Sequence, residues 1–456
     1  MLSEHRSGAA VLQVLETGND RAASSLATDA RMPRGALTMA WWAVCSAMFY
    51  VFLGATVALK YGTTNALVGV SAAVITFGVL NGVFVRYAVR TGSSSSVLSR
   101  TMLGTKGGAI PTLILCATCI YYAVFEGSVL AVAASKVLPG LSYQNAVLLI
   151  VVYSTPLAVG SVQKFFDKFN GILLPFYLLG LALLVGLTVS HRGYSSAWLH
   201  VGPAVTSRVW SPWSSFVAYS GMLGLSMVTM DFARFGRVQD ETYHATINFG
   251  VPFYAVTLLL SGTVGIFLIG TIRPEQITET SVVDVCLTVL GGGAGLAWVL
   301  VTQTRINSAN FYIATVNLQA FLEEALGLRV PKVLCATIIG AVVLLLMRTT
   351  DVFSYILAAQ RYQGIFLTAW VGVAAAHITA ALRSSRGRAG SGAAAARTSH
   401  EPLPYRWRGI LSWSCGVIAG LGLMALGGLA VTFSAPVTLL MAALVYRQLG
   451  VSPART

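Results

Sequence analysis

The chain has 456 residues, of which 55% are hydrophobic and 10% are charged, and its mean hydropathy is +0.73. Soluble domains carry about 25% charged residues, so this composition excludes a soluble protein. The formal charge of +14 does not indicate nucleic-acid binding, because the Lys and Arg residues lie in short segments between apolar blocks rather than in one patch with aromatic residues. We therefore predict an integral membrane protein.

Long apolar blocks recur along the whole chain. Residues 35–59 contain no charged side chain, and a helix that rises roughly 1.5 Å per residue crosses a hydrocarbon core of about 30 Å in about 20 residues. The block at 283–318 is longer than one straight crossing requires, so we expect it to tilt or to extend beyond the membrane. The pattern predicts an all-α polytopic membrane protein with about twelve transmembrane helices, near residues 35–59, 63–89, 108–135, 143–162, 169–190, 212–233, 247–271, 283–318, 331–347, 352–381, 409–431 and 433–448.

Lys and Arg residues are concentrated in alternate loops, and this bias sets the orientation of a membrane protein. The loops after the second, fourth, sixth, eighth and tenth blocks carry most of them. The N-terminal segment lacks the apolar stretch of a secretory signal. We therefore predict a multi-pass protein of the cell membrane, plasma or inner, with both termini in the cytoplasm.

Two blocks contain small or polar residues near their centres. Many transporters consist of two inverted repeats, and their substrate site lies where one helix of each repeat is broken at the membrane midplane. Small residues also serve close packing between helices in lipid. The first and sixth blocks are candidates for broken helices on the basis of Cys45, Ser46 and Ala47 in the first and Ser220, Gly221 and Gly224 in the sixth.

Three ionisable side chains lie at the expected depth of the membrane, where each costs about 2.5–3.5 kcal/mol or more. They are Glu126 in the third block, Arg305 in the eighth and Arg361 in the tenth. An acid and a base that face one cavity would neutralise each other, and the acid could also exchange a proton during a cycle. The alternative is a structural ion pair that holds helices together.

Aromatic and amide side chains lie near these charges. Tyr121, Tyr122 and Phe125 precede Glu126 and would form a flat wall for a planar heterocycle, or pack against neighbouring helices. The eighth block carries many Thr, Asn and Gln residues, including Asn310. Their amides suit the edge of a nucleobase, or hydrogen bonds between helices.

Several function classes lack their signatures. The P-loop, H-E-x-x-H and G-x-S-x-G motifs are absent, as are the filter repeat and charge ring of an ion channel. Cys116 and Cys119 form a C-x-x-C without a second pair, so they are expected to be small packing residues. We therefore predict no enzymatic activity, no cofactor, no metal site and no nucleic-acid partner.

Three stretches resemble segments of the purine/cytosine permease family, the nucleobase:cation symporters. They are RTGSSSSVLSRTMLGTKGGAIP (Arg90 to Pro111), MVTMDFARFGR (Met227 to Arg237) and NSANFYIATVNLQAF (Asn307 to Phe321). The match is spread over most of residues 35–382, in the family's order and spacing. The resemblance implies a leucine-transporter-type fold: two inverted five-helix repeats hold the substrate between spans one, three, six and eight, and two peripheral helices follow.

The resemblance also implies substrate-binding residues. Family members stack a planar ring on an aromatic residue of span three, which matches Tyr121, and hydrogen-bond it with an Asn of span eight, which matches Asn310. Their Gly-aromatic pair in span six matches Gly221 and Met222, so Met222 replaces an aromatic wall.

Two further positions depart from the family in span three. Phe125 stands where some members carry a hydrogen-bonding Gln, and Glu126 follows it. The substrate could therefore differ from a plain nucleobase.

The coupling ion is expected to differ from that of sodium-coupled members. Those members bind Na⁺ between spans one and eight with hydroxyls that match Thr304 and Arg305 here. A guanidinium stays protonated at physiological pH, so it would repel Na⁺ and could stand in for it. We therefore expect a sodium-independent carrier, either coupled to H⁺ through Glu126 or acting as a facilitator or exchanger. Arg361 would complete an anion-friendly pocket, or pair with Glu126.

Asp231 and Arg234 lie at the inner end of span six. A charge-assisted pair there would assist a cytoplasmic gate or, as we favour, fix the end of the helix.

These observations together predict a domain organisation and a function. We expect residues 1–32 to form a cytoplasmic tail, 33–382 a ten-helix transport core, 383–408 a flexible basic cytoplasmic linker, and 409–456 two peripheral helices with a short tail. The predicted function is secondary active transport of a nucleobase or related nitrogen heterocycle by alternating access. A carrier of the same fold for an amino acid or organic acid, or a membrane sensor that does not transport, are the alternatives. The expected partners are a small heterocyclic substrate, a coupling cation, H⁺ rather than Na⁺, and the lipid bilayer.

Overall fold

The computed structural model describes residues 31–159, 167–202, 211–272, 280–387 and 403–450. Within these ranges, nine helices are long and apolar enough to cross a membrane, and the bent pair Arg34–Ser46 and Met48–Tyr61 makes a tenth crossing. Two more helices, α7 and α15, take the places of the fourth and eighth expected blocks. The helices are α2 (Arg34–Trp41), α3 (Met48–Tyr61), α4 (Thr63–Thr91), α5 (Ser95–Leu103), α6 (Thr105–Val137), α7 (Tyr143–Leu157), α8 (Asp167–Arg192), α9 (Ser211–Ala218), α10 (Leu225–Ala233), α11 (Glu241–Tyr243), α12 (Val251–Tyr254), α13 (Ser261–Ile272), α14 (Ser281–Leu290), α15 (Gly292–Leu326), α16 (Lys332–Thr349), α17 (Ile356–Gly387), α18 (Trp407–Leu426) and α19 (Ser434–Gln448).

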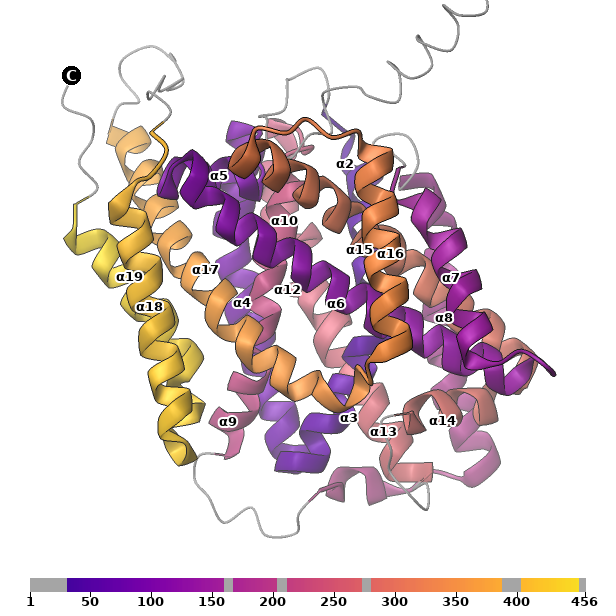
Figure 1. Cartoon of the computed structure of the whole chain (residues 1–456). Helices are drawn as coiled ribbons and strands as arrows, with labels where there is room; N and C mark the ends of the chain where they lie inside the picture. Colours follow the sequence, from indigo (N-terminus) through magenta and orange to yellow (C-terminus); the bar gives the residue numbers. More distant parts are fainter. Residues whose placement is uncertain (1–30, 160–166, 203–210, 273–279, 388–402, 451–456) are drawn as a thin grey trace, which may run out of the picture.

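The helices form one bundle, and its centre is built on α6 and α15, which pack against each other (Figure 1). The helices α18 and α19 pack together at one edge of the bundle and contact α17. The all-helical polytopic architecture predicted from the apolar blocks is therefore confirmed, and the last two helices are peripheral.

The first span is bent at a break, and the sixth is interrupted by a 3-10 turn, both at the small central residues singled out from the sequence. In the first span, α2 ends at Trp41, a 3-10 turn follows at Val44–Ser46, and α3 begins at Met48 with a bend of 43°. In the sixth span, the 3-10 turn η6 (Ser220–Gly224) separates α9 from α10.

The eighth block differs from the expectation of one tilted or extended helix. It is divided at Gly291, which adopts φ +79°, into the short helix α14 and the 35-residue helix α15. A positive φ is accessible to Gly without the steric cost that a Cβ would add. The glycine-rich start of this block therefore makes a sharp turn between two helices.

The short helix α5 lies at one end of the bundle, which we call the α5 end (Figure 1). Its N-cap residue Ser94 accepts a hydrogen bond from the backbone N–H of Val97 (3.1 Å), and the helix ends at Gly104, where φ is +89°. Ser99, buried in this helix, accepts from the indole N–H of Trp370 on α17 (2.8 Å). The polar serine run therefore lies in the protein interior, fixed by hydrogen bonds.

The expected linker at 383–408 needs correction at both ends. Helix α17 continues to Gly387, and Leu403 and Pro404 are held against α6, because their carbonyls accept from the backbone N–H groups of Thr105 (3.0 Å) and Lys106 (2.9 Å). Paired backbone groups of this kind fix the chain. The middle of the expected linker, 388–402, and most of the N-terminal tail, 1–30, lie outside the described residues.

Candidate functional site

A cavity of about 40 Å³ lies where the two broken spans face α6 and α15. Most of its walls are apolar, and the polar side chains are few. Such a composition is typical of sites for small organic ligands. The lining residues are Val44, Ala47, Phe49, Tyr50, Leu115, Thr118, Cys119, Tyr122, Glu126, Gly221, Met222, Gly224, Leu225, Val228, Ile306, Ala309, Asn310 and Ile313.

The C-terminal end of α2 is bound by Arg305 from α15. The Nη2 of Arg305 donates to the backbone carbonyl of Trp42 (2.8 Å), and its Nε donates to the Oγ of Ser46 (3.3 Å). Trp42 caps α2, and Ser46 ends the 3-10 turn in the break. The Arg305 side chain is buried, so its positive charge lies inside the protein at the carbonyl end of a half-helix.

The N-terminal end of α3 is bound by Glu126 from α6. The Oε1 of Glu126 accepts from the backbone N–H of Phe49 (3.3 Å), in the first turn of α3. The Gln303 amide satisfies its neighbours when its nitrogen faces Glu126; it then donates to the Oε2 and to the backbone carbonyl of Glu126 (3.3 Å). Both carboxylate oxygens therefore accept from protein donors.

At the break in the first span, each of the two half-helix ends is therefore bound by a side chain of opposite charge. A helix carries partial negative charge at its C-terminus and partial positive charge at its N-terminus. Arg305 lies at the C-terminus of α2, and Glu126 lies at the N-terminus of α3. Each buried charge is stabilised by the half-helix that it meets.

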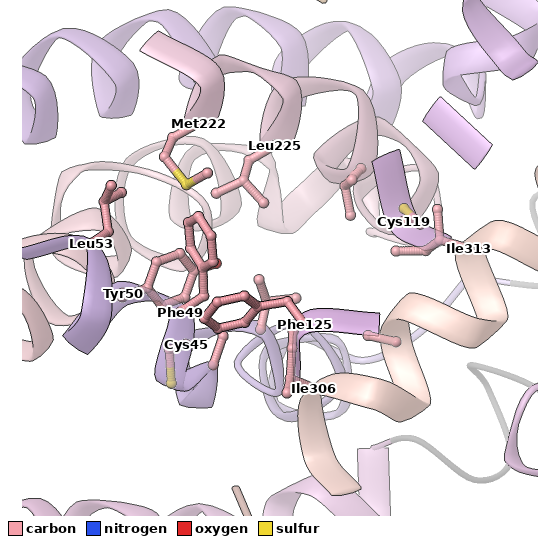
Figure 2. Packing of buried hydrophobic residues seen from close by; sticks show 14 of the residues in the cluster. Cys45, Phe49, Tyr50, Leu53, Cys119, Phe125, Met222, Leu225, Ile306 and Ile313 are labelled. Atoms are coloured by element: carbon pink, nitrogen blue, oxygen red, sulfur yellow. The ribbon is translucent and has the colours of Figure 1, made fainter. Parts of the chain in front are cut away.

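Four of the predicted substrate-binding residues line the cavity: Glu126, Gly221, Met222 and Asn310. Figure 2 shows Met222 and Leu225 of the sixth span pointing toward the rings of Phe49 and Tyr50. Asn310, on α15, is buried, and its Nδ2 lies 3.5 Å from the Oδ1 of Asn307. The structure therefore brings residues of four expected spans to one place.

Tyr121 does not line the cavity, and Tyr122 takes its place. Residues three and four apart share one face of a helix, and Tyr122 and Glu126 are four apart, whereas Tyr121 lies on the neighbouring face. The ring of Tyr121 packs edge-on against Tyr122, with centroids 5.6 Å apart. The lining residues of α6 recur at the helical period: Leu115, Thr118, Cys119, Tyr122 and Glu126.

Phe125 also lies outside the cavity lining. Its ring packs at centroid distances of 5.2 Å from Phe49, 5.4 Å from Phe52 and 5.2 Å from Phe353. Its ring lies beside Phe49 (Figure 2), so Phe125 supports a residue of the cavity wall, and its own contact with a substrate, expected from the resemblance, stays a prediction.

The other two predicted ion-coupling residues lie away from the cavity. Arg361 is exposed on α17, and its Nε donates to the backbone carbonyl of Leu357 (3.3 Å). Thr304 is half-buried, and its hydroxyl contacts the hydroxyl of Tyr153 (3.0 Å) on α7. Among the described residues, the Glu126 carboxylate contacts the backbone of Met48 and Phe49 and the Gln303 amide, so the expected pair between Glu126 and Arg361 is not formed.

Asp231 and Arg234 lie buried at the α5 end of the sixth span. The Oδ1 of Asp231 accepts from the backbone N–H (2.9 Å) and the hydroxyl (2.8 Å) of Ser95, at the start of α5. The Nε of Arg234 donates to the backbone carbonyl of Asp231 (3.2 Å). The carboxylate therefore caps α5 and ties it to α10.

Residues that were not singled out from the sequence complete the site. Gln303 contacts Glu126 as described, and Gln360 and Gln363 on α17 contact Tyr122. The hydroxyl of Tyr122 donates to the Oε1 of Gln363 (3.0 Å) and accepts from the Nε2 of Gln360 (3.0 Å). The two glutamines are three residues apart on a helix otherwise rich in apolar residues, and that spacing was the available signal.

A helical bundle whose first and sixth spans are interrupted next to one central cavity fits a leucine-transporter-type fold. The sequence matches no family model and no curated protein. Solved structures show the likeness instead. A structure of Mhp1, a nucleobase-cation-symport-1 family transporter, in a closed conformation with bromovinylhydantoin bound, covers 95% of this chain and 94% of its own at a TM-score of 0.70 and 13% identity.

Two further transporters share the fold. A Na⁺-coupled sialic acid symporter in a substrate-bound outward-open state has a TM-score of 0.58 at 10% identity, over 96% of this chain and 94% of its own. A mutant of the manganese transporter of Eremococcus coleocola has a TM-score of 0.53 at 12% identity, over 92% of this chain and 98% of its own. TM-scores above 0.5 over nearly the whole chain show the fold that the resemblance implied, and at these low identities they show the fold alone.

Proposed function

We propose that the chain is a secondary transporter that moves a nucleobase or a related nitrogen heterocycle across the cell membrane by alternating access. The shared fold supports transport, and the composition of the cavity supports a flat substrate. Phe49, Tyr50 and Tyr122 offer rings, and Asn310 and Glu126 offer hydrogen-bonding groups. A heterocycle needs this combination of apolar faces and a polar edge.

We further propose that transport is independent of Na⁺, and the position of Arg305 is the observation that carries this proposal. Half-helix C-termini and unwound carbonyls bind the cation in transporters with broken helices. Here the guanidinium of Arg305 already binds the carbonyl of Trp42 and the hydroxyl of Ser46. A fixed positive charge at this point repels a second cation and replaces its structural role.

A proton is the coupling ion that the site supports best. Glu126 is the acid that lines the cavity, and it contacts the first turn of α3, next to the break. Uptake and release of a proton there would change the charge at the N-terminus of α3 during the cycle. Facilitated diffusion or exchange requires no such change.

The organic-acid alternative loses its main support, because Arg361 lies on an exposed face. A sensor that binds without transporting would use the same cavity, so only a flux assay separates it from a carrier.

The experiment is a thermal-shift screen of the detergent-purified chain with purines, pyrimidines and hydantoins, each with and without Na⁺. A ligand that binds the folded state raises the unfolding temperature by an amount set by its concentration relative to Kd. We expect a shift from a heterocycle that does not depend on Na⁺ and that is lost in Asn310→Ala. A shift that requires Na⁺ would contradict sodium independence.

A further inference from the structure

The cavity wall next to the break in the first span presents an acid and no base. Glu126 lines the cavity, and its carboxylate binds the first turn of α3 through Phe49. Of the lining residues in the described part of the chain, none is Lys, Arg or His. The charge of the cavity wall is therefore set by Glu126.

Glu126 occupies a helix N-terminus of the kind that binds an anionic group of the substrate in other transporters. The N-terminus of a half-helix attracts anionic groups, and in transporters with broken helices it binds the anionic group of the substrate. Here that N-terminus belongs to α3, and the protein's own carboxylate occupies it. A substrate carboxylate would have to displace Glu126 and lie beside its negative charge, which is unfavourable at short range.

The other two candidate anion-binding groups are engaged elsewhere. The Nη2 and Nε of Arg305 donate to Trp42 and Ser46, on the α2 side of the break, and Arg305 is not a lining residue. The N-terminus of α10 continues from η6, and the backbone N–H of Leu225 donates to the carbonyls of Met222 and Leu223. Neither group offers a substrate carboxylate a replacement for the α3 N-terminus.

Glu126 retains capacity for further hydrogen bonds. An ionised carboxyl group is an acceptor only, with about four lone-pair sites, and the contacts with the backbone of Phe49 and Met48 and with the Gln303 amide use three of them. The remaining site can accept from an amino group or a protonated ring nitrogen.

We infer that the substrate presents a hydrogen-bond donor, an amino group or a cationic nitrogen, to Glu126 and carries no carboxylate at that end. This inference rests on the proposed function, because it names the substrate class of the same cavity. This substrate class is the opposite of the anionic one that a pocket containing Arg361 would have favoured.

The test compares matched ligands on the detergent-purified full chain. Cytosine carries an exocyclic amino group, orotate carries a carboxylate on a similar ring, and uracil carries neither; putrescine and succinate form a pair of amine and acid without a ring. Affinities are measured by thermal shift and by calorimetry on the wild type, Glu126→Gln and Asn310→Ala. The unfolding temperature without ligand shows that each variant is folded.

We expect cytosine to bind the wild type at least about tenfold more tightly than orotate, since hydrogen bonds to charged groups contribute more than neutral ones. Glu126→Gln is expected to reduce that preference about tenfold, whereas Asn310→Ala should weaken cytosine and uracil alike. If putrescine binds and the ring compounds do not, the heterocycle proposal fails and the inference stands. Tighter binding of orotate than cytosine, or of succinate than putrescine, would overturn the inference, as would the absence of binding by all five ligands.

Discussion

The guanidinium of Arg305, on α15, donates to the backbone carbonyl of Trp42 at 2.8 Å, and Trp42 is the C-cap of α2. Removing one partner of a buried hydrogen bond leaves the other unsatisfied at a cost of about 1–3 kcal/mol. We therefore expect Arg305→Ala to lower the unfolding temperature of the purified protein. In this variant the Trp42 carbonyl and Ser46 lack a cation, so we expect added Na⁺ to raise its unfolding temperature. Arg361→Ala is the matched control: its side chain is exposed, and we expect no response to Na⁺. If Na⁺ does not change the unfolding temperature of Arg305→Ala, the idea that Arg305 takes the place of a bound cation is wrong.

The two neighbouring tyrosines of α6 should respond differently to loss of the hydroxyl. Tyr122 lines the cavity and is hydrogen-bonded to Gln360 and Gln363, whereas Tyr121 lies outside the lining. Loss of the Tyr122 hydroxyl leaves the Gln360 and Gln363 side chains without this partner beside the cavity, so we expect Tyr122→Phe to weaken heterocycle binding about fivefold, or about 1 kcal/mol, and Tyr121→Phe to change it less than twofold. Kd values from titrations of both variants check this expectation. Equal effects would restore Tyr121 as the contact that the resemblance implied.

Gly221 lies in the break of the sixth span, in close contact with α17. A Cβ added there would lie 2.0 Å from the Oε1 and 2.8 Å from the backbone carbonyl oxygen of Gln360. The backbone of α17 would have to move, so we expect Gly221→Ala to destabilise the protein by about 1–3 kcal/mol and to weaken ligand binding. Gly422→Ala on α18 is the control, because a Cβ there meets no atom within 4 Å, and it should be neutral or slightly stabilising. Thermal unfolding of both variants measures the difference, and an equal stability of the two would contradict the close approach.

Much of the architecture followed from the sequence because membrane helices are long and uniformly apolar. The two breaks were also predicted, since Ser46 and Gly221 interrupt apolar blocks. The apolar blocks did not predict the rotation of each helix about its axis, which decides the face that lines the cavity. Tyr121 and Tyr122 differ by one residue, or about 100° around the helix, and only packing decides which of them faces the cavity. Arg361 is a similar case, because an arginine within an apolar block can lie on an exposed face.

Glu324 lies in the last turn of the 35-residue helix α15, beyond the length that a crossing requires. Ser96 on α5 donates to its Oε1, and Arg100 lies 3.8 Å from the same oxygen, while its Oε2 has no hydrogen-bond partner among the described residues. Burial raises the pKa of Glu324 from 4.5 to about 7, although Ser96 and Arg100 act in the opposite direction. The α5 end of the bundle therefore contains a carboxyl group that titrates near neutral pH.

A raised pKa means that the folded state favours the protonated form of Glu324. Its contribution to stability is complete below pH 4.5 and is lost as the pH rises through about 7. We expect the unfolding temperature of the wild type, relative to Glu324→Gln, to fall between pH 5 and pH 8. The comparison is made by thermal unfolding of both proteins across that range. A difference that does not change with pH, or one that increases, would show that this carboxyl is not held in its protonated form.

The central claim is that the cavity at the two breaks carries a nitrogen heterocycle across the membrane without Na⁺. The most direct measurement is uptake of the radiolabelled heterocycle that gives the largest thermal shift, into liposomes that contain the purified protein, with Na⁺ or with choline outside. We predict uptake above that of protein-free liposomes, equal in the two media, and lost in Asn310→Ala. Uptake that requires Na⁺ would contradict the role of Arg305, and binding without any uptake would show that the protein is a sensor and not a carrier.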